Sequence, residues 1–512
     1  MTSLVQHFLE QSAAQLPDKT ALVCDGRRLT YREIEGMANQ LAHGLKAMGV
    51  QRGDRVGIFL PNSVEAVVGI FGVLKADAVF VVINHTTKRD KLRYILENCR
   101  ATALLAEGRS QALELARETP LPFLRGVLLT GKTDPQAHPL PALCRNWEEA
   151  LAPLPETRPP SANVDLDLAC LVYTSGSTGD PKGVMSDHSN VVFASGSIIQ
   201  YLENIQEDIV LNVLPLSFDY GLYQLLMTFR FGGTLVLEKS FAFPAAILKT
   251  IERERVTGFP GVPTIFAMLA PMDLSAFDLS RLRYLSNTAA ALPVSHIQEI
   301  RRKFPWARLY SMYGLTETKR TLYLPPARLD DKPGSVGIAI PGTETWLVDE
   351  QGNRLPPGST GELVARGRHV MRGYWEAPDA TAHRFRPGPI PGERVCYSGD
   401  VFRTDDEGYF YFVSRKDDII KSRGEKISPK EVESVLYALE GVVQAAVIGV
   451  ADPVLGHAIK AILVVQGRTL TTPEVLAHCK AHLEDYMMPK HVEFRDSLPM
   501  TSSGKIAKKD LV

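Results

Sequence analysis

The stretch Tyr173-Thr-Ser-Gly-Ser-Thr-Gly-Asp-Pro-Lys-Gly183 combines three glycines with four short hydroxyl side chains and a lysine. An apolar run at residues 170–173 opens onto it and predicts a buried strand that leads into a loop. Glycine lets backbone N–H groups surround a phosphate, while the hydroxyls and Lys182 add donors and positive charge. The stretch is not a P-loop, because glycine follows Lys182 where that motif has serine or threonine. Its composition alone is equally typical of a flexible surface loop.

Apolar runs and helical segments alternate on the N-terminal side of this loop. Residues 55–60, 78–83 and 103–106 predict short buried strands. Residues 31–48 predict a helix, and Ser63 is placed to cap a second helix that begins at Val64. Strands that alternate with helices of ten or more residues predict an α/β fold of parallel sheets covered by helices. Further strands are predicted at residues 210–216, 234–237 and 309–312.

The last third of the chain has a different pattern. Residues 351–358 are rich in turn formers, and the short alternating segments after them predict a β-rich region. A smaller mixed α+β unit is predicted at the end of the chain, with strands at 442–450 and 461–465 and helices at 429–438 and 472–483. A chain of 512 residues has room for roughly three domains, or for one large and one small domain.

Composition excludes several classes of protein. Lys and Arg number 57 against 58 Asp and Glu, which argues against a broad basic surface for nucleic acid or anionic lipid. The six cysteines form no Cys-x-x-Cys pair, so the sequence suggests neither a zinc knuckle nor a disulfide framework, and a reducing compartment is expected. No secretory signal and no uninterrupted apolar span is visible. We therefore expect a cytoplasmic protein that binds neither nucleic acid nor membranes.

Four further motifs follow the loop in a fixed order along the chain. They are Met312-Tyr-Gly-Leu-Thr-Glu317, Tyr397-Ser-Gly-Asp400, Arg415-Lys-Asp-Asp-Ile-Ile-Lys-Ser-Arg-Gly424 and Pro499-Met-Thr-Ser-Ser-Gly-Lys505. With the loop, this set resembles the adenylate-forming (ANL) superfamily, which includes acyl-CoA synthetases and other AMP-binding enzymes, luciferases, and the adenylation domains of nonribosomal peptide synthetases. The resemblance extends over nearly the whole chain, and five motifs in order are far more specific than any one of them.

The resemblance implies an AMP-forming acid–thiol ligase that uses ATP and Mg2+. A carboxylate would attack the α-phosphate of ATP, expel pyrophosphate and leave an acyl-adenylate. A thiol, from CoA or from the phosphopantetheine of a carrier protein, would then take the acyl group. The transition state of the first step concentrates negative charge, so positioning and cationic stabilisation would supply most of the catalysis.

Residue roles follow from the same resemblance. Glu317 would ligate Mg2+, Thr316 would contact the α-phosphate, and Lys505 would bridge the carboxylate and α-phosphate oxygens during adenylation. Asp400 would accept hydrogen bonds from both ribose hydroxyls, and Arg415 would also reach the ribose. The β- and γ-phosphates would be held by Thr174, Ser175, Gly176, Ser177, Thr178, Gly179 and Lys182. The adenine side of the nucleotide site would comprise Ala289, Ala290, Ala291, Met312, Tyr313 and Gly314.

The resemblance also implies two domains that change their relative orientation. Residues 1–416 would form the N-terminal adenylation core, and residues 417–512 a small mobile C-terminal domain that carries Lys505. Asp417 falls at the hinge position of the family. Gly424 would line the tunnel for the thiol, where a side chain would narrow the passage. One departure from the family pattern is Ser414, which stands where glycine is common.

The residues around the acid substrate leave two interpretations open. By resemblance its pocket would be lined by Asp219, Tyr220, Tyr223, Pro260, Ser286, Thr288, Met312, Arg320 and Thr321. Phe218-Asp219 is similar to the pair with which amino-acid adenylation domains bind the substrate's ammonium group, and the competing interpretation is that Asp219 caps a helix. Lys319 and Arg320 would either receive a second carboxylate or pair with a nearby acidic residue.

Three functions therefore stay open at this point. The first is a freestanding adenylation enzyme for an amino acid or another acid, acting with a separate carrier protein or with CoA. The second is an acyl-CoA synthetase for a plain aliphatic or aromatic acid. The third is a non-catalytic nucleotide-binding protein on the same fold, although every motif position that needs a charge has one.

Overall fold

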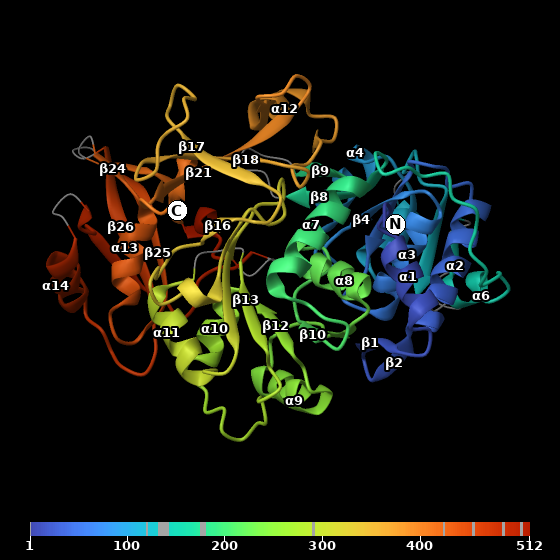
Figure 1. Ribbon diagram of the computed structural model, residues 1–512, viewed down its shortest axis with the longest axis horizontal. Coiled ribbons are helices and arrows are strands. Elements are labelled where there is room, and N and C mark those ends of the chain that lie inside the picture. The colour runs from blue at the N-terminus through green and yellow to red at the C-terminus, as the bar shows by residue number, and fades with distance from the viewer. Residues whose placement is uncertain are drawn as a thin grey trace.

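The computed structural model (Figure 1) describes residues 2–118, 121–131, 143–174, 181–288, 292–422, 425–452, 456–483, 487–501 and 505–511. Its sheets and helices form a mixed α/β fold with a large N-terminal part and a smaller C-terminal part, so the predicted fold class is confirmed. No helix in the described ranges is both long and apolar enough to cross a membrane.

An eight-stranded sheet contains the strand that leads into the predicted phosphate loop. In spatial order its strands are β19 (Gly373–Tyr374), β9 (Lys182–Asp187), β8 (Leu168–Thr174), β4 (Val79–Val82), β3 (Arg55–Phe59), β5 (Ala101–Glu107), β6 (Gly126–Thr130) and β7 (Cys144–Asn146). The strands from β8 to β7 are parallel. All four residues of β4 are buried, as expected for a parallel sheet covered on both faces.

A nine-stranded sheet forms the other half of the large N-terminal part. In spatial order its strands are β16 (Ile338–Ala339), β15 (Leu322–Leu324), β14 (Arg308–Tyr313), β13 (Tyr284–Asn287), β12 (Gly258–Gly261), β10 (Ile209–Asn212), β11 (Thr234–Leu237), β1 (Thr20–Cys24) and β2 (Arg27–Thr30). The strands from β14 to β1 are parallel. Their carboxyl ends therefore meet along one edge of the sheet, where α/β proteins commonly bind ligands.

The strand predicted at residues 210–216 is shorter than expected and ends at Asn212. Beyond that point, hydrogen bonds to side-chain amides replace the backbone hydrogen bonds between neighbouring strands. The Leu214 N–H donates to Asn212 Oδ1 at 3.1 Å, and Asn62 Nδ2 donates to the Leu214 carbonyl at 3.0 Å. The Leu216 N–H donates to Asn62 Oδ1 at 3.0 Å. Apolar periodicity does not reveal this change, because the residues stay buried while their hydrogen-bond partners change.

Helices fill the space between the two large sheets (Figure 1). α3 (Val64–Lys75) contacts β3 and β4, while α2 (Tyr31–Ala47) contacts β1 and β2 of the other sheet, and the two helices pack together. α7 (His188–Leu202) and α8 (Asp219–Phe231) bridge the sheets in the same way, and α1 (His7–Gln15) packs on α8. Ser63 caps α3 as predicted, since its Oγ accepts from the Ala66 N–H at 3.1 Å.

The remaining helices of this part lie around the sheets. They are α4 (Arg89–Asn98), α5 (Gln111–Glu118), α6 (Trp147–Leu151), α9 (Pro244–Glu254), α10 (Pro263–Leu269), α11 (Val294–Lys303), α12 (Pro378–Arg384) and the short 3-10 helix η1 (Pro326–Arg328).

The predicted β-rich region is a five-stranded antiparallel sheet. It comprises β17 (Glu344–Val348), β18 (Thr360–Arg366), β21 (Arg394–Thr404), β20 (Phe385–Pro387) and β22 (Phe410–Arg415). β22 pairs with β21 and ends at Arg415, where the short 3-10 helix η2 (Lys416–Asp418) begins.

The C-terminal part has a sheet and an apolar core of its own. The sheet comprises β24 (Glu425–Ile427), β23 (Ile420–Ser422), β26 (Gly456–Val465), β25 (Val442–Asp452) and β27 (His491–Phe494). α13 (Pro429–Tyr437) and α14 (Thr472–His482) pack together beside it, and Val432, Leu436 and Val475 belong to one buried cluster. The chain then runs back through Lys505 to the short helix η4 (Lys508–Leu511).

Candidate active site

The turn after β14 brings several predicted residues together at the carboxyl edge of the nine-stranded sheet. The Thr321 N–H donates to the Tyr313 carbonyl at 2.9 Å, so residues 314–320 form a closed loop. Glycine is required at position 314, because a Cβ atom there would lie 2.1 Å from the Lys319 carbonyl oxygen. This close approach of two backbone segments fixes the positions of Thr316, Glu317 and Arg320 relative to the sheet.

Replacement of Gly314 by alanine should destabilise the protein by at least about 2 kcal/mol, because the clash is with the main chain and cannot be relieved by a rotamer change. Chemical denaturation measures this loss. Gly36→Ala is a matched control inside α2, where the added Cβ meets only the flexible Glu156 side chain at 3.0 Å. Alanine favours a helix interior, so the control should be neutral or stabilising. Equal stability of the two variants would contradict the proposed backbone constraint.

Asp400 occupies a buried position between Tyr313 and Arg415. The Tyr313 hydroxyl donates to Asp400 Oδ2 at 2.6 Å, and Arg415 Nε lies 3.5 Å from Oδ1. Antiparallel pairing of β21 with β22 sets Asp400 directly opposite Arg415. Burial raises the pKa of Asp400, while Arg415 and the Tyr313 hydrogen bond act in the opposite direction. Three residues from three predicted motifs are thus joined in one polar cluster.

Glu317 is held by two residues that the motifs did not indicate. The Tyr374 hydroxyl donates to Glu317 Oε1 at 2.5 Å, and Arg384 Nε lies 3.7 Å from the same oxygen. Burial opposes ionisation of Arg384, but Glu317, Tyr374 and Cys396 together outweigh it and raise the Arg384 pKa. Lys182 at the start of β9 places its Nζ 5.9 Å from the centre of the Tyr374 ring. Tyr374 therefore lies between the lysine of the predicted phosphate loop and the Glu317 carboxylate.

The chemistry of this cluster is compatible with Mg2+. Magnesium in nucleotide sites is commonly bound by one or two carboxylates together with substrate phosphates and water. Glu317 is such a carboxylate, and no group of three or more potential metal ligands occurs in the part of the chain that the structure describes. One carboxylate together with the phosphates of ATP is a donor set of this kind.

Lys505 lies at the same site, although it belongs to the C-terminal part. Its side chain is accessible to solvent, yet the surrounding protein and Arg415 lower its pKa. The carboxylates of Asp400, Glu317 and Asp219 are near enough to oppose that effect. The Lys505 N–H donates to Thr501 Oγ1 at 3.1 Å, and the Lys505 carbonyl accepts from the Thr501 N–H at 2.7 Å. These two hydrogen bonds hold the Lys505 backbone against Thr501.

The nine residues predicted to line the acid pocket come together and are all buried. They are Asp219, Tyr220, Tyr223, Pro260, Ser286, Thr288, Met312, Arg320 and Thr321. Within this set, the Tyr220 hydroxyl contacts both the carbonyl and the Oγ of Ser286 at 2.8 Å. The residues come from α8, from the neighbouring strands β12, β13 and β14, and from the segments that directly follow β13 and β14, and their role in lining an acid pocket stays a prediction.

Asp219 does not cap a helix, so that interpretation of the residue was wrong. Phe218 is the N-cap of α8, and Asp219 is the first helical residue. Its Oδ1 lies 3.1 Å from Lys319 Nζ, and its Oδ2 accepts from Arg320 Nη1 at 3.3 Å. The alternative in which Lys319 and Arg320 pair with a nearby acidic residue is therefore confirmed.

Some predicted residues lie outside the described part of the chain. These are Ser175, Gly176, Ser177, Thr178, Gly179, Ala289, Ala290, Ala291 and Gly424. Thr174 ends β8 beside the first of these gaps, and Thr288 precedes the second. The backbone of Asp417 lies in η2.

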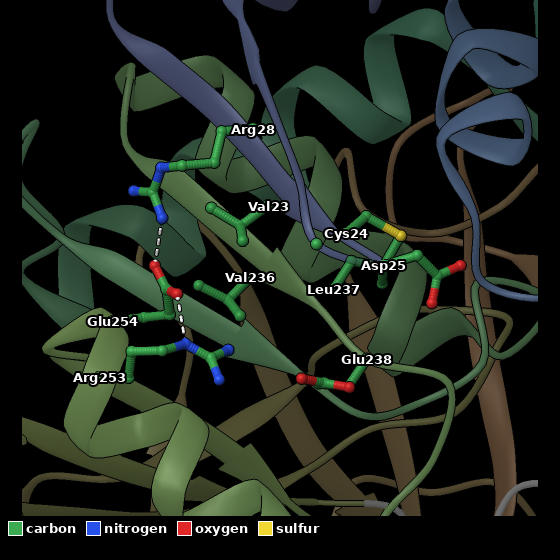
Figure 2. Close-up of a pocket in the computed structure, with 10 residues that line it drawn as sticks. Val23, Cys24, Asp25, Arg28, Val236, Leu237, Glu238, Arg253 and Glu254 are labelled. Atoms are coloured by element: carbon green, nitrogen blue, oxygen red, sulfur yellow. Dashed lines mark hydrogen bonds and ion pairs between the residues drawn. The ribbon is translucent and has the colours of Figure 1, made fainter.

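A separate cavity of about 370 Å3 lies near the far end of the nine-stranded sheet (Figure 2). None of the predicted site residues lines it. Three of its charged side chains already pair with one another, because Glu254 contacts both Arg28 and Arg253 (Figure 2). The nucleotide motifs therefore define a different and better candidate for the active site.

Comparisons with known proteins agree with this geometry. The AMP-binding enzyme family matches residues 9–375, and the AMP-binding enzyme C-terminal domain matches residues 431–505. A feruloyl-CoA synthase from Amycolatopsis sp is 36% identical over 97% of this chain and 96% of its own length. A long-chain-fatty-acid–CoA ligase from Bacillus subtilis is 32% identical over 99% of this chain and 94% of its own.

Solved structures give the same result. The anthranilate CoA ligase AuaEII, in complex with anthranoyl-AMP, superposes with a TM-score of 0.91 at 29% identity. The match covers 100% of this chain and 97% of that one. The resemblance drawn from the motifs is thus confirmed, and with it the use of ATP, Mg2+ and CoA in ATP-dependent activation of an acid. The chain belongs to the AMP-binding enzyme family and is an AMP-forming acid–thiol ligase.

Proposed function

We propose that the enzyme is an acyl-CoA synthetase for a carboxylic acid that lacks an α-amino group. The supporting observation is the double pairing of Asp219. In an amino-acid enzyme this carboxylate would have to receive the substrate's ammonium group. Here Lys319 and Arg320 already contact its two oxygens, at 3.1 and 3.3 Å. An entering ammonium would add a third cation beside a single buried carboxylate, which is electrostatically costly.

The names of the relatives agree with a plain acid and with CoA as the acceptor. Two of them are a feruloyl-CoA synthase and a long-chain-fatty-acid–CoA ligase, and the structural neighbour is an anthranilate CoA ligase. The alternative acceptor, a carrier-protein phosphopantetheine, is an outcome that the experiment below distinguishes.

In the proposed first half-reaction, the enzyme's side chains orient ATP and stabilise charge. Asp400 and Arg415 hold the ribose, while the loop around Thr174 and Lys182 holds the β- and γ-phosphates. Thr316 and Lys505 contact the α-phosphate while the carboxylate attacks it. Glu317 would hold Mg2+ together with the phosphates, and the bound metal would supply positive charge against the developing pyrophosphate. The lysine's proximity to Asp400 and Glu317 in this structure supports its role in adenylation.

In the proposed second half-reaction, the C-terminal domain turns about the main chain at Asp417. Residues 1–416 form the fixed core, and residues 417–512 form the moving domain. The separate sheet and core of the C-terminal part support this division. Once Lys505 has left the site, the segment that contains Gly424 lines the path by which the thiol reaches the adenylate.

Thioester assays with purified enzyme test the proposed acid and acceptor. Each acid, with or without an α-amino group, is incubated with ATP and Mg2+ and offered CoA and a holo carrier protein side by side. We expect acyl-CoA from acids without an α-amino group. Efficient loading of an amino acid onto the carrier protein, with no CoA thioester from any acid, would contradict the proposal. Absence of pyrophosphate exchange with every acid would favour a non-catalytic nucleotide-binding protein.

Tyr374→Phe should raise the Mg2+ concentration required for half-maximal pyrophosphate release by several-fold and lower kcat about tenfold. The phenol donates the charge-assisted hydrogen bond that holds Glu317, and such bonds contribute about 1.5–3 kcal/mol. Magnesium titrations at saturating ATP measure the change. Tyr411→Phe, which removes a hydroxyl bonded to Asp405 at 3.2 Å outside the site, is the control. An unchanged magnesium requirement in Tyr374→Phe would contradict a positioning role for this tyrosine.

A further inference from the structure

The cluster of Asp219, Lys319 and Arg320 has more positive than negative charge. Lys319 Nζ and Arg320 Nη1 share the single carboxylate of Asp219, at 3.1 and 3.3 Å. The three side chains are only 6%, 0% and 3% exposed, in the order Asp219, Lys319, Arg320. One carboxylate cannot neutralise two buried cations, and an uncompensated charge away from water is very costly.

The groups packed around the cluster do not remove this excess. The Arg320 guanidinium lies 4.5 Å from the centre of the Tyr220 ring, and Lys319 Nζ lies 5.9 Å from that of Tyr223. Aromatic faces stabilise a cation but carry no net charge. Asp187, a further carboxylate of this region, caps α7, where its Oδ1 accepts from the Asn190 N–H at 2.8 Å. Within the described part of the chain Asp187 forms no ion pair with Lys319 or Arg320, which both pair with Asp219 instead.

Several polar atoms of the cluster still have bonding capacity. Among the described residues, Arg320 Nε and Nη2 find no hydrogen-bond acceptor although both are buried. The Thr288 hydroxyl and the Tyr223 hydroxyl, both from the predicted acid pocket, also lack partners there. Two guanidinium donors and two hydroxyls match the oxygens of a planar anion such as a carboxylate.

Lys319 is held in an unusual backbone conformation. Its φ is +58°, in the left-handed region that residues other than glycine, asparagine and aspartate seldom adopt. Such strain persists only where the surrounding structure imposes it, and it is concentrated at functional sites. The turn that requires Gly314 thus also directs the lysine toward Asp219.

We propose that the acid activated by this enzyme carries a second carboxylate, and that Arg320 and Lys319 receive it. The inference rests on the proposed function, because it concerns the substrate of the same acid pocket. Asp219 neutralises one of the two cations and orients both, and the substrate's second carboxylate neutralises the other. The bulky Tyr220, Tyr223 and Met312 side chains favour a compact diacid.

Pairs of acids with one skeleton test the proposal in the wild-type enzyme. The pairs are butanoate with succinate, and benzoate with phthalate, and the readout is kcat/KM for pyrophosphate release with CoA present. We expect the diacid of at least one pair to be favoured by at least about tenfold, since charge-assisted bidentate pairing is strong. Preference for the monoacid in both pairs would overturn the proposal, while the proposed CoA ligase function would stand. No pyrophosphate release with any acid would contradict the proposed function itself.

Two variants change the charge of the cluster in opposite directions. Asp219→Asn keeps the shape and raises the net charge, so the diacid-to-monoacid ratio should rise. Lys319→Asn lowers the net charge, and asparagine tolerates the left-handed backbone there, so the ratio should fall. If the cluster had a purely structural role, each variant would lower the activity toward the diacid and toward the monoacid equally. Movement of the ratio in the same direction in both would overturn the proposal.

Arg320→Lys tests whether the planar donor geometry of the guanidinium is required in addition to its charge. Because the replacement is conservative, it also tests the proposal if either of the other two variants fails to fold. Lysine retains the positive charge but lacks the planar pair of donors. The diacid-to-monoacid ratio should fall at least about fivefold, while the KM for ATP stays constant because lysine keeps the charge and Arg320 is not among the residues predicted to contact ATP. Thermal unfolding of each variant accompanies the kinetics. An unchanged ratio in a folded Arg320→Lys variant would also overturn the proposal.

Discussion

Lys505→Ala should reduce acid-dependent ATP–pyrophosphate exchange by about a hundred- to a thousandfold. A fixed charge beside the α-phosphate contributes several kcal/mol in the transition state, and each 1.36 kcal/mol is about tenfold in rate. The lysine's pKa responds to Asp400, Glu317 and Asp219, which places its charge among the nucleotide and acid residues. Thioester formation from a supplied acyl-adenylate should remain, because in the proposed cycle the lysine leaves the site before that step.

Lys509→Ala is the matched control for this prediction. Lys509 is exposed on η4, four residues further along the chain. The control should retain normal exchange and normal thioester formation. Near-normal exchange in Lys505→Ala would show that the catalytic lysine has been wrongly assigned. Equal loss of both half-reactions would mean that the lysine also acts outside adenylation.

Asp417→Pro should separate the two half-reactions. Proline fixes φ near −65° and removes a backbone donor, so a main-chain rotation at this residue is blocked. Position 417 lies in the short 3-10 helix η2, whose first turn tolerates both restrictions. The arrangement with Lys505 at the nucleotide residues should therefore persist. We expect pyrophosphate exchange close to normal, and thioester formation reduced by at least about a hundredfold.

Asp417→Ala distinguishes loss of the side chain from loss of torsional freedom. This variant should complete both half-reactions at close to the normal rate. Rapid-quench measurement of adenylate and thioester in the same reaction gives both rates. If Asp417→Pro lost both steps equally while its unfolding free energy was unchanged, domain rotation about this residue would be contradicted.

The sequence predicted the fold well where apolar periodicity and motifs act locally. The strands at β3, β4 and β5 and the cap at Ser63 are present as expected. Strand ends were less predictable, because the Asn62 amide, distant in sequence, takes over the hydrogen bonds beyond Asn212. No local pattern reveals a partner that lies 152 to 154 residues away in the sequence.

The candidate site shows the same division between local and long-range information. Motifs identified Asp400, Arg415 and Glu317 because their spacing is fixed within short segments. The contact of Tyr374 with Glu317 depends on pairing of β19 with β9, which joins segments about 190 residues apart. The sequence left two interpretations of Lys319 and Arg320 open without naming a partner, and only the tertiary structure identifies Asp219 as the acidic residue with which they pair. The spacing of motifs along the sequence therefore could not predict the balance of charges in the acid pocket.

The central claim is that the substrate carboxylate attacks the α-phosphate of ATP. The most direct test of this claim is whether oxygen is transferred from the acid to AMP. The acid that is turned over is labelled with oxygen-18 in its carboxylate and incubated with ATP, Mg2+ and CoA. Mass spectrometry of the products should find one labelled oxygen in AMP and none in pyrophosphate, because the carboxylate oxygen that attacks phosphorus stays with it when the thiol displaces AMP. Label in inorganic phosphate, with ADP as the other product, would contradict an acyl-adenylate intermediate and the residue roles built on it.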